Sequence, residues 1–301
     1  MSEVDQFLRE MLNEYNIFTN LIIAYHQFKF KSENDRYDFK QLIIFIGKEL
    51  RDINYKVVNS SIIDNPVFIT GCGCSGTSLC GKLLSNHSNI YFIPFETRVF
   101  CLGLDKNILL TIFQLFSYIC IKMGKKLWSE KTPAHVHNIN DIFEVLPNAT
   151  VIIVTRHGKA VSSSLKYFYN STFQFGLERW IKDNLAWINN VHNEKCLVIK
   201  YEEIVRNSLT VFQILCASLN IEFENLCNTQ YNTTHIDWSK SEHLTSSKDR
   251  IKLRWWQINQ PIYDNIDESM TKTNDDENLL FDNFVYDNYT ANIVLKRLNY
   301  V

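Results

Sequence analysis

The chain has 301 residues, of which 46% are hydrophobic, and a formal net charge of -2 at pH 7. This length and apolar content predict one large globular domain with a sizeable core, or one domain with appendages. A net charge so close to zero gives no reason to expect nucleic acid or an anionic membrane as a partner. The eight cysteines lack the spacing of a zinc site. We therefore expect reduced thiols, no metal, and a cytoplasmic protein.

The N-terminal residues do not have the pattern of a secretory signal. Residues 1–10 carry acidic side chains rather than a basic start followed by an apolar run. The most apolar window, residues 108–121, is shorter than the roughly 20 residues that span a bilayer. We predict a buried helix there and no transmembrane segment.

The chain before residue 64 has helical periodicity. Apolar residues recur at three- and four-residue spacing in 7–15 and again in 42–50. We expect residues 1–63 to form a helical cap packed on the core. Residues 64–301 would form the main domain, with its core at 65–220 and a covering C-terminal region at 221–301.

A glycine-rich turn follows the first buried strand. The apolar run 67–70, between a proline and glycines, predicts that strand. Gly71 and Gly76 then have the G-x-x-x-x-G spacing of a loop that cradles phosphate with backbone N–H groups. Thr77 occupies the position where a nucleotide hydrolase carries lysine, so an ordinary ATPase or GTPase is disfavoured. A tight strand-to-helix turn with no ligand would use similar residues.

Strands and helices alternate through the rest of the core. The patterns predict strands at 89–94, 149–155 and 196–200. They predict helices at 108–121, 177–191 and 209–219, a helix that begins at 132, and another that ends at about 169. This alternation predicts an α/β fold of three layers, with a mainly parallel sheet between helices. Ligands lie beyond the carboxyl ends of such strands, where residues 71–78, Glu96 and 156–164 all fall.

The C-terminal quarter is less regular. Residues 235–260 mix tryptophans with a basic cluster that includes Lys248 and Arg250, and residues 264–278 read as an acidic, solvated loop. Residues 281–301 read as a terminal helix or strand that packs back on the domain.

Five short motifs resemble the PAPS-dependent sulfotransferase family, where PAPS is 3′-phosphoadenosine 5′-phosphosulfate. They occur in the family's order, at residues 74–79, 95–98, 130–133, 156–164 and 200–204. The nearest branch is the one that contains protein-tyrosine sulfotransferases and related bacterial enzymes. The resemblance covers residues 65–220 and implies a P-loop-type sulfotransferase fold, related to nucleotide kinases, with PAPS as donor and no metal.

The resemblance also implies a donor site. The residues it places on the 5′-phosphosulfate are Cys74, Ser75, Gly76, Thr77 and Ser78. Arg156 and Ser164 match the pair that holds the 3′-phosphate. Arginine suits that task because its planar fork pairs with phosphate through two hydrogen bonds.

Two further positions match the family's catalytic residues. Glu96 matches the carboxylate that accepts the acceptor's proton, and Lys131 matches the lysine that stabilises the transferring sulfuryl group. A structural ion pair of Glu96 with Arg98 is the alternative for the carboxylate, and a solvated side chain is the alternative for the lysine. The rival bases are His87, His135, His137 and His157, and His135 is the strongest of these.

Cys74 departs from the family pattern. Most members carry lysine or arginine immediately before Ser-Gly-Thr, and a thiol supplies no permanent positive charge. Either Lys82, Lys131 or the basic cluster with Lys248 and Arg250 replaces that cation, or activity is weak, altered or lost. A small-molecule or nucleoside kinase and a non-catalytic PAP- or glycan-binding protein therefore remain alternatives. The acceptor, whether glycan, lipid, small metabolite or tyrosine, is open.

Overall fold

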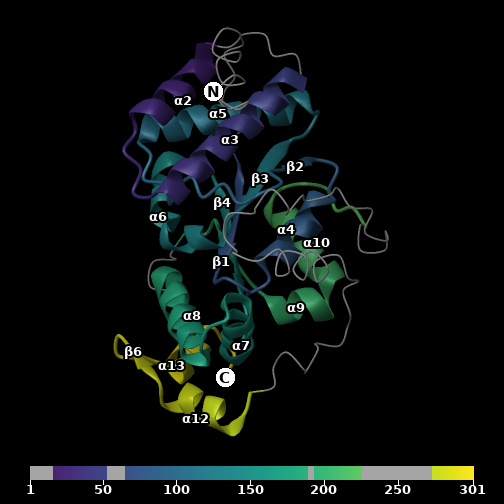
Figure 1. Cartoon of the computed structure of the whole chain (residues 1–301). Coiled ribbons are helices and arrows are strands. Elements are labelled where there is room, and N and C mark those ends of the chain that lie inside the picture. Colours follow the sequence, from purple (N-terminus) through teal and green to yellow (C-terminus); the bar gives the residue numbers. More distant parts are fainter. Residues whose placement is uncertain (1–15, 53–64, 189–192, 226–272) are drawn as a thin grey trace.

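A parallel β-sheet forms the centre of the computed structural model, which describes residues 16–52, 65–188, 193–225 and 273–301. Within these residues the sheet has five strands in the order β2-β3-β1-β4-β5, all parallel (Figure 1). The strands are β1 (Val67–Gly71), β2 (Ile90–Phe92), β3 (Leu127–Lys131), β4 (Thr150–Thr155) and β5 (Cys196–Lys200). Because the strands are parallel, their carboxyl ends lie at one edge of the sheet.

The side chains of the central strands alternate between two apolar layers. Phe68 of β1 and Val151 and Ile153 of β4 join the core on one face of the sheet. Ile69 and Ile152, the next residues along, join the core on the other face. This period of two is that of a strand, and burial on both faces explains the continuous apolar runs.

Helices cover both faces of the sheet. In Figure 1, α6 (Ile139–Val145) and α8 (Phe173–Ile188) lie on the left of the sheet, while α4 (Thr77–Ser85), α9 (Tyr201–Arg206) and α10 (Ser208–Ser218) lie on the right. Residues of α5 (Lys106–Lys122), η1 (Pro133–His137) and α7 (Gly158–Tyr169) belong to the same apolar core as those of α6 and α8. The predicted three-layer α/β fold is therefore confirmed.

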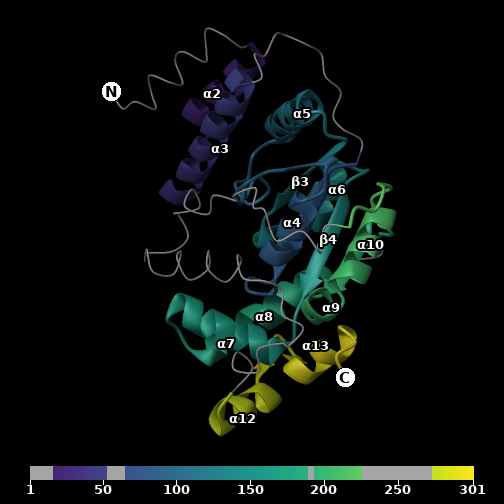
Figure 2. The same cartoon turned by 90° about the vertical axis from the view of Figure 1, so that its right-hand side faces the viewer.

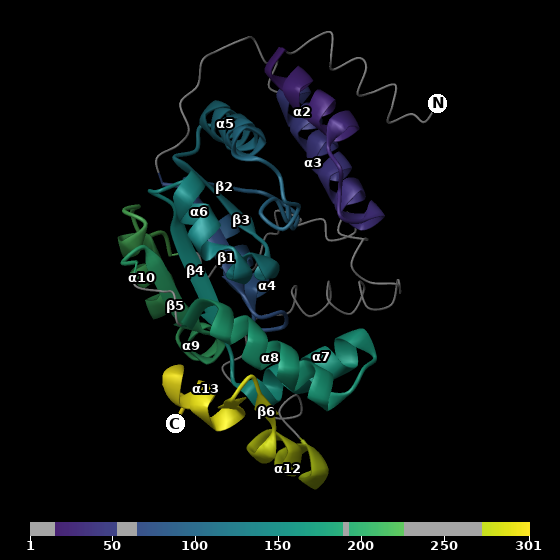
Figure 3. The same cartoon turned by 90° about the vertical axis from the view of Figure 1, so that its left-hand side faces the viewer.

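Two N-terminal helices pack on α5. They are α2 (Asn16–Gln27) and α3 (Glu33–Asp52), and Figures 2 and 3 show them beside α5, away from the sheet. Phe39, Leu42, Ile43 and Ile46 of α3 are fully buried and belong to the α5-side core. Residues 7–15 of the expected cap lie outside the described residues.

The predicted strands did not include β3, which was an error. Ser129, Glu130 and Lys131 are polar, yet all five residues of this strand are buried between β2 and β1. Glu130 and Lys131 have partners distant in the sequence, as described below. The prediction of an acidic loop at 264–278 was also partly wrong. Asp275 and Asp276 begin α12 (Asp275–Asn283), and Asn274 caps that helix. Acidic side chains favour a helix N-terminus, where they face the positive end of its dipole.

The C-terminal segment packs back on α8, as expected. It contains β6 (Val285–Tyr286), β7 (Tyr289–Thr290) and α13 (Ala291–Arg297). The Phe281 ring lies 6.2 Å from that of Trp180 and 6.0 Å from that of His157, measured between centroids. Among the helices that the structure describes, none combines the length and the hydropathy needed to cross a membrane.

Replacement of Gly176 by alanine should destabilise the fold, although alanine has a higher helix propensity than glycine. A Cβ at this position would lie 2.5 Å from the Ser162 carbonyl oxygen, because α7 and α8 approach closely there. We expect this overpacking to lower the free energy of unfolding by about 1–3 kcal/mol, measured by urea denaturation. An unchanged or increased free energy of unfolding would show that α7 and α8 can move apart without loss of stability.

Candidate functional site

The carboxyl edge of the sheet collects most of the predicted site residues. The turn after β1, residues 71–76, meets Arg156, which follows β4, and Tyr201, which follows β5. Arg156 Nη1 donates to the Cys74 carbonyl oxygen at 3.3 Å. The Arg156 guanidinium carbon also lies 4.2 Å from the centre of the Tyr201 ring, a cation–π contact. Three separate chain segments therefore meet at this edge.

The glycine-rich turn has the backbone geometry of an anion-binding loop. Gly76 has a φ of 99°, and a Cβ there would lie 2.4 Å from Tyr201 Cδ2, so this position requires glycine. Thr77 and Ser78 begin α4, and the first N–H groups of a helix have no acceptor inside it. These groups can bind a phosphate at the positive end of the helix dipole.

Ser75 is used differently from the other residues of this turn. Its hydroxyl donates to the Val154 carbonyl oxygen at 2.8 Å, and its N–H donates to the Cys72 carbonyl oxygen at 3.1 Å. Ser75 is fully buried. Its two donors hold the turn against β4 in this conformation, so its contribution to an anion site is to shape the turn.

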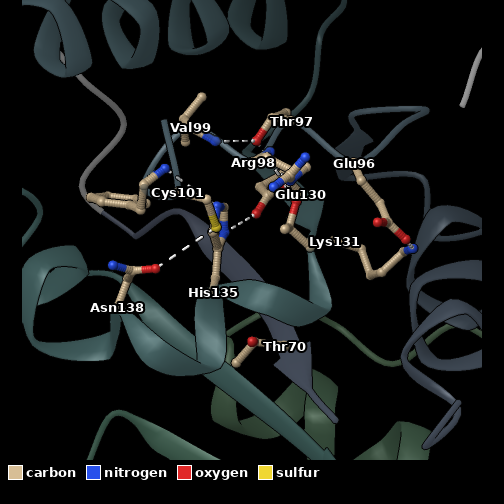
Figure 4. A network of polar contacts seen from close by, with 12 residues as sticks. Thr70, Glu96, Thr97, Arg98, Val99, Cys101, Glu130, Lys131, His135 and Asn138 are labelled. Carbon is tan, nitrogen blue, oxygen red and sulfur yellow. Dashed lines mark hydrogen bonds and ion pairs between the residues drawn. The ribbon is translucent and has the colours of Figure 1, made fainter. Parts of the chain in front are cut away.

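Glu96 and Lys131 form an ion pair (Figure 4). The Lys131 ammonium donates to Glu96 Oε1, and both side chains are nearly buried, at 1% and 10% exposed. Lys131 pairs in register with Ile69, whose side chain packs on the α4 side of the sheet. Lys131 therefore leaves β3 on the side of α4 and the glycine-rich turn, and the two predicted catalytic residues lie together.

The alternative prediction, a structural ion pair of Glu96 with Arg98, was wrong. Arg98 pairs instead with α3, where its Nη1 lies 2.7 Å from Asp38 Oδ2 and its Nη2 lies 3.8 Å from Asp35 Oδ1. This contact ties the segment that carries Glu96 to the N-terminal helices. The idea of a solvated Lys131 was also wrong, since that side chain is buried.

A buried carboxylate, Glu130, organises the surroundings of this pair (Figure 4). Its Oε2 accepts hydrogen bonds from Thr97 Oγ1 at 3.0 Å and Thr132 Oγ1 at 2.9 Å, and its Oε1 lies 2.7 Å from His135 Nδ1. Thr132 Oγ1 also accepts from the Arg98 N–H at 3.2 Å. We call these four side chains, Glu130, Thr97, Thr132 and His135, the Glu130 network. The network fixes residues 97–98 to β3 and η1.

The histidines proposed as rival bases have structural partners. His135 is fully buried, and its Nε2 accepts from the Phe100 N–H at 3.4 Å, so it is unsuited to be the base that meets a substrate. His87 Nε2 lies 2.8 Å from the Glu222 carbonyl oxygen, and His137 Nε2 lies 2.8 Å from Asp183 Oδ1. His157 caps α7, and burial lowers its pKa.

The remaining predicted site residues are less closely linked to this edge. Ser164 lies on α7 and is partly exposed. Lys82 is buried on α4, and desolvation lowers its pKa. Lys248 and Arg250 lie outside the described residues. Within the described part of the chain, no cluster of histidine, cysteine, aspartate and glutamate could hold a metal ion.

Sequence reasoning overlooked Glu130 and Tyr201. Both lie inside the motifs at 130–133 and 200–204, where only Lys131 was predicted to have a role. The order Glu-Lys-Thr-Pro after the buried segment was the available signal for Glu130. Its role depends on Thr97 and His135, whose proximity the sequence does not reveal.

Comparison with known proteins supports the family that the motifs resemble. A family model described as "Sulfotransferase family" matches residues 103–225. No curated protein matches the chain. The matched segment contains Lys131 and Arg156, whereas the glycine-rich turn and Glu96 precede it.

Solved structures match a larger part of the chain than the family model does. The chain is similar to the sulfotransferase domain from the curacin biosynthetic pathway, with 19% identity, a TM-score of 0.53, and coverage of 80% of this chain and 99% of that one. It is also similar to the sulfotransferase domain from the Synechococcus PCC 7002 olefin synthase, with 15% identity, a TM-score of 0.48, and coverage of 82% and 97%. A third is mouse sulfotransferase SULT7A1 complexed with PAP, with 14% identity, a TM-score of 0.47, and coverage of 80% and 90%.

The first of these likenesses shows a sulfotransferase fold. The family model and the motifs agree with this fold and support the sulfotransferase family. The nearest branch, with the protein-tyrosine enzymes, stays a prediction.

Substitution of Glu130 by leucine should destabilise the protein strongly. The change removes a fully buried carboxylate and leaves His135 and two hydroxyl groups without their partner. We expect a loss of about 3–5 kcal/mol in the free energy of unfolding, measured by urea denaturation. The matched control is Glu144→Leu on the exposed face of α6, expected to change stability by no more than about 0.5 kcal/mol. Equal effects of the two changes would contradict a structural role for the Glu130 network.

Proposed function

We propose that this protein transfers a sulfuryl group from PAPS to an acceptor hydroxyl, with Glu96 and Lys131 as its catalytic residues. One observation supports this reaction most directly: a buried lysine and a carboxylate pair at the same sheet edge as an anion-binding turn. A structural ion pair alone would not require a glycine turn and Arg156 beside it.

The first N–H groups of α4 would bind the 5′-phosphate side of the donor. Charge builds on that phosphate as the bond between sulfur and the bridging oxygen breaks, and fixed N–H dipoles stabilise such charge. Arg156 would bind the 3′-phosphate through its fork, and Ser164 would assist it. Because Arg156 already contacts Tyr201 and the Cys74 carbonyl group, its guanidinium is held in place before the donor binds.

Glu96 and Lys131 divide the remaining chemistry. As the acceptor oxygen forms its new bond to sulfur, Glu96 would take the hydroxyl proton, so that the products are a sulfate ester, PAP and a protonated carboxyl group. The Lys131 ammonium has three donors, of which one bonds Glu96 in this structure. During transfer the ammonium would bond a sulfuryl oxygen and the departing bridging oxygen.

A second candidate function is binding of PAP or a glycan without catalysis. Cys74 is the observation that favours it, because a thiol replaces the cation that most of the family has at this position. A kinase is less well supported, since Thr77 replaces the lysine that binds a triphosphate. The acceptor is proposed only as a hydroxyl compound: a glycan, lipid, small metabolite or tyrosine.

Arg156→Ala should weaken the binding of PAP by about 10- to 100-fold, because charge-assisted hydrogen bonds to one phosphate are lost. Calorimetric titration with PAP, with and without magnesium and beside ATP, measures this affinity. The control is Arg206→Ala on the exposed side of α9. Binding of ATP that depends on magnesium, with no binding of PAP, would overturn the proposal in favour of a kinase.

Glu96→Gln should lower the rate of sulfuryl transfer by about 10²- to 10⁴-fold, because the proton acceptor is lost. The affinity for PAP should change little. Transfer from labelled PAPS is measured with a phenol, a monosaccharide, a fatty alcohol and a tyrosine peptide. A full rate in the variant would remove Glu96 from the mechanism. Tight PAP binding by the parent protein with no transfer to any acceptor would favour the non-catalytic function.

A further inference from the structure

The glycine-rich turn contains no positively charged residue, but a positively charged side chain from another segment lies beside it. Arg179 lies on α8 and reaches toward Gly73, the residue before Cys74. Arg179 Nη2 lies 3.7 Å from the position that a Cβ on Gly73 would occupy, and its Cζ lies 3.9 Å from it. A guanidinium that is 106 residues away in the sequence therefore lies beside the turn.

The packing of α8 against α7 brings Arg179 to this position. Gly176 contacts the α7 backbone, where a Cβ would lie 2.5 Å from the Ser162 carbonyl oxygen. Arg179 is three residues further on, and residues at this spacing share one side of a helix. Figures 2 and 3 show α7 and α8 beside the end of α4 at which the turn lies.

Two other contacts orient the Arg179 fork. Nη1 donates to the Tyr169 hydroxyl at 3.2 Å, and Nε lies 3.5 Å from Asp183 Oδ2. Asp183 also binds His137, so its charge is shared between two partners. With Nε and Nη1 engaged in this way, Nη2 is the part of the guanidinium that faces the turn.

Arg179 keeps its charge, and the Cys72 thiol of the turn does not form an ion pair with it. Burial alone would lower the pKa of Arg179, but its contacts with Tyr169 and Asp183 raise it above its usual value. Burial, assisted by Asp183, raises the pKa of Cys72 well above its usual value, so that thiol stays neutral. The side chain of Arg179 is 33% exposed, which leaves it accessible from solvent.

We propose that Arg179 supplies the donor-binding positive charge that Cys74 cannot, reaching the 5′-phosphate of PAP or PAPS from α8. This inference rests on the proposed function and names the residue that completes its donor site. Two other cations at this edge have other roles in the proposed function, Lys131 at the sulfuryl group and Arg156 at the 3′-phosphate.

The test compares PAP binding by the parent protein, Arg179→Gln, Arg179→Lys and Lys182→Gln. Lys182 is exposed on the same helix and serves as the control for charge. Loss of one charge-assisted contact should weaken PAP binding by about 10- to 100-fold in Arg179→Gln, and by less in Arg179→Lys. The fall in affinity between 50 and 500 mM NaCl should be smaller for Arg179→Gln, because one charge fewer binds the phosphate.

A second variant separates a charge from a packing role. Cys74→Arg, which restores the family's cation, should recover most of the lost PAP affinity in the Arg179→Gln background. Failure of this rescue, with a lowered melting temperature, would show that Arg179 only braces α7 and overturn the proposal. Normal PAP binding by Arg179→Gln would overturn it as well. If the parent protein itself binds no PAP, the proposed function fails, which is a distinguishable result.

Discussion

The buried carboxylate of Glu130 is the constraint on which the geometry of the site depends. Removing a carboxylate from water is expensive unless hydrogen bonds and a nearby positive or polar group replace the water. Here the replacement comes from Thr97, in the segment after β2, and from Thr132 and His135, at the start of η1 and within it. These contacts hold the segment after β2 against the end of β3. The same arrangement places Glu96, next to Thr97, against Lys131, next to Glu130.

The N-terminal helices extend this constraint. Arg98 has a φ of 54°, which is unusual for a residue with a side chain, and its guanidinium pairs with Asp35 and Asp38 of α3. The backbone N–H of the same residue donates to Thr132. Residues 96–98 are therefore held from β3 on one side and from α3 on the other. A helix pair that could be regarded as an appendage contributes directly to the position of Glu96.

Much of the fold could be predicted because its decisive elements are apolar and local. The runs in β1 and β4 and the glycine turn between β1 and α4 are readable without knowledge of distant partners. β3 could not be predicted in this way, since burial of Glu130 and Lys131 makes sense only with partners about 30 residues earlier. The partner of Arg98 was misjudged for the same reason, because Asp38 is 60 residues away. Motif order identified the site residues, but only the tertiary structure pairs them.

Cys74 and Arg179 illustrate how a charge can move within a fold while its place in space is kept. A phosphate responds to the positive charge near it and not to the chain segment that carries that charge. The turn's N–H groups come from backbone geometry, which Gly76 and the buried Ser75 help to hold. The cation is the separable part of the site, and α8 already passes beside Gly73 because Gly176 lets it pack closely on α7. A family pattern that lacks its usual cation at one position is therefore compatible with a complete donor site when a neighbouring helix carries that charge.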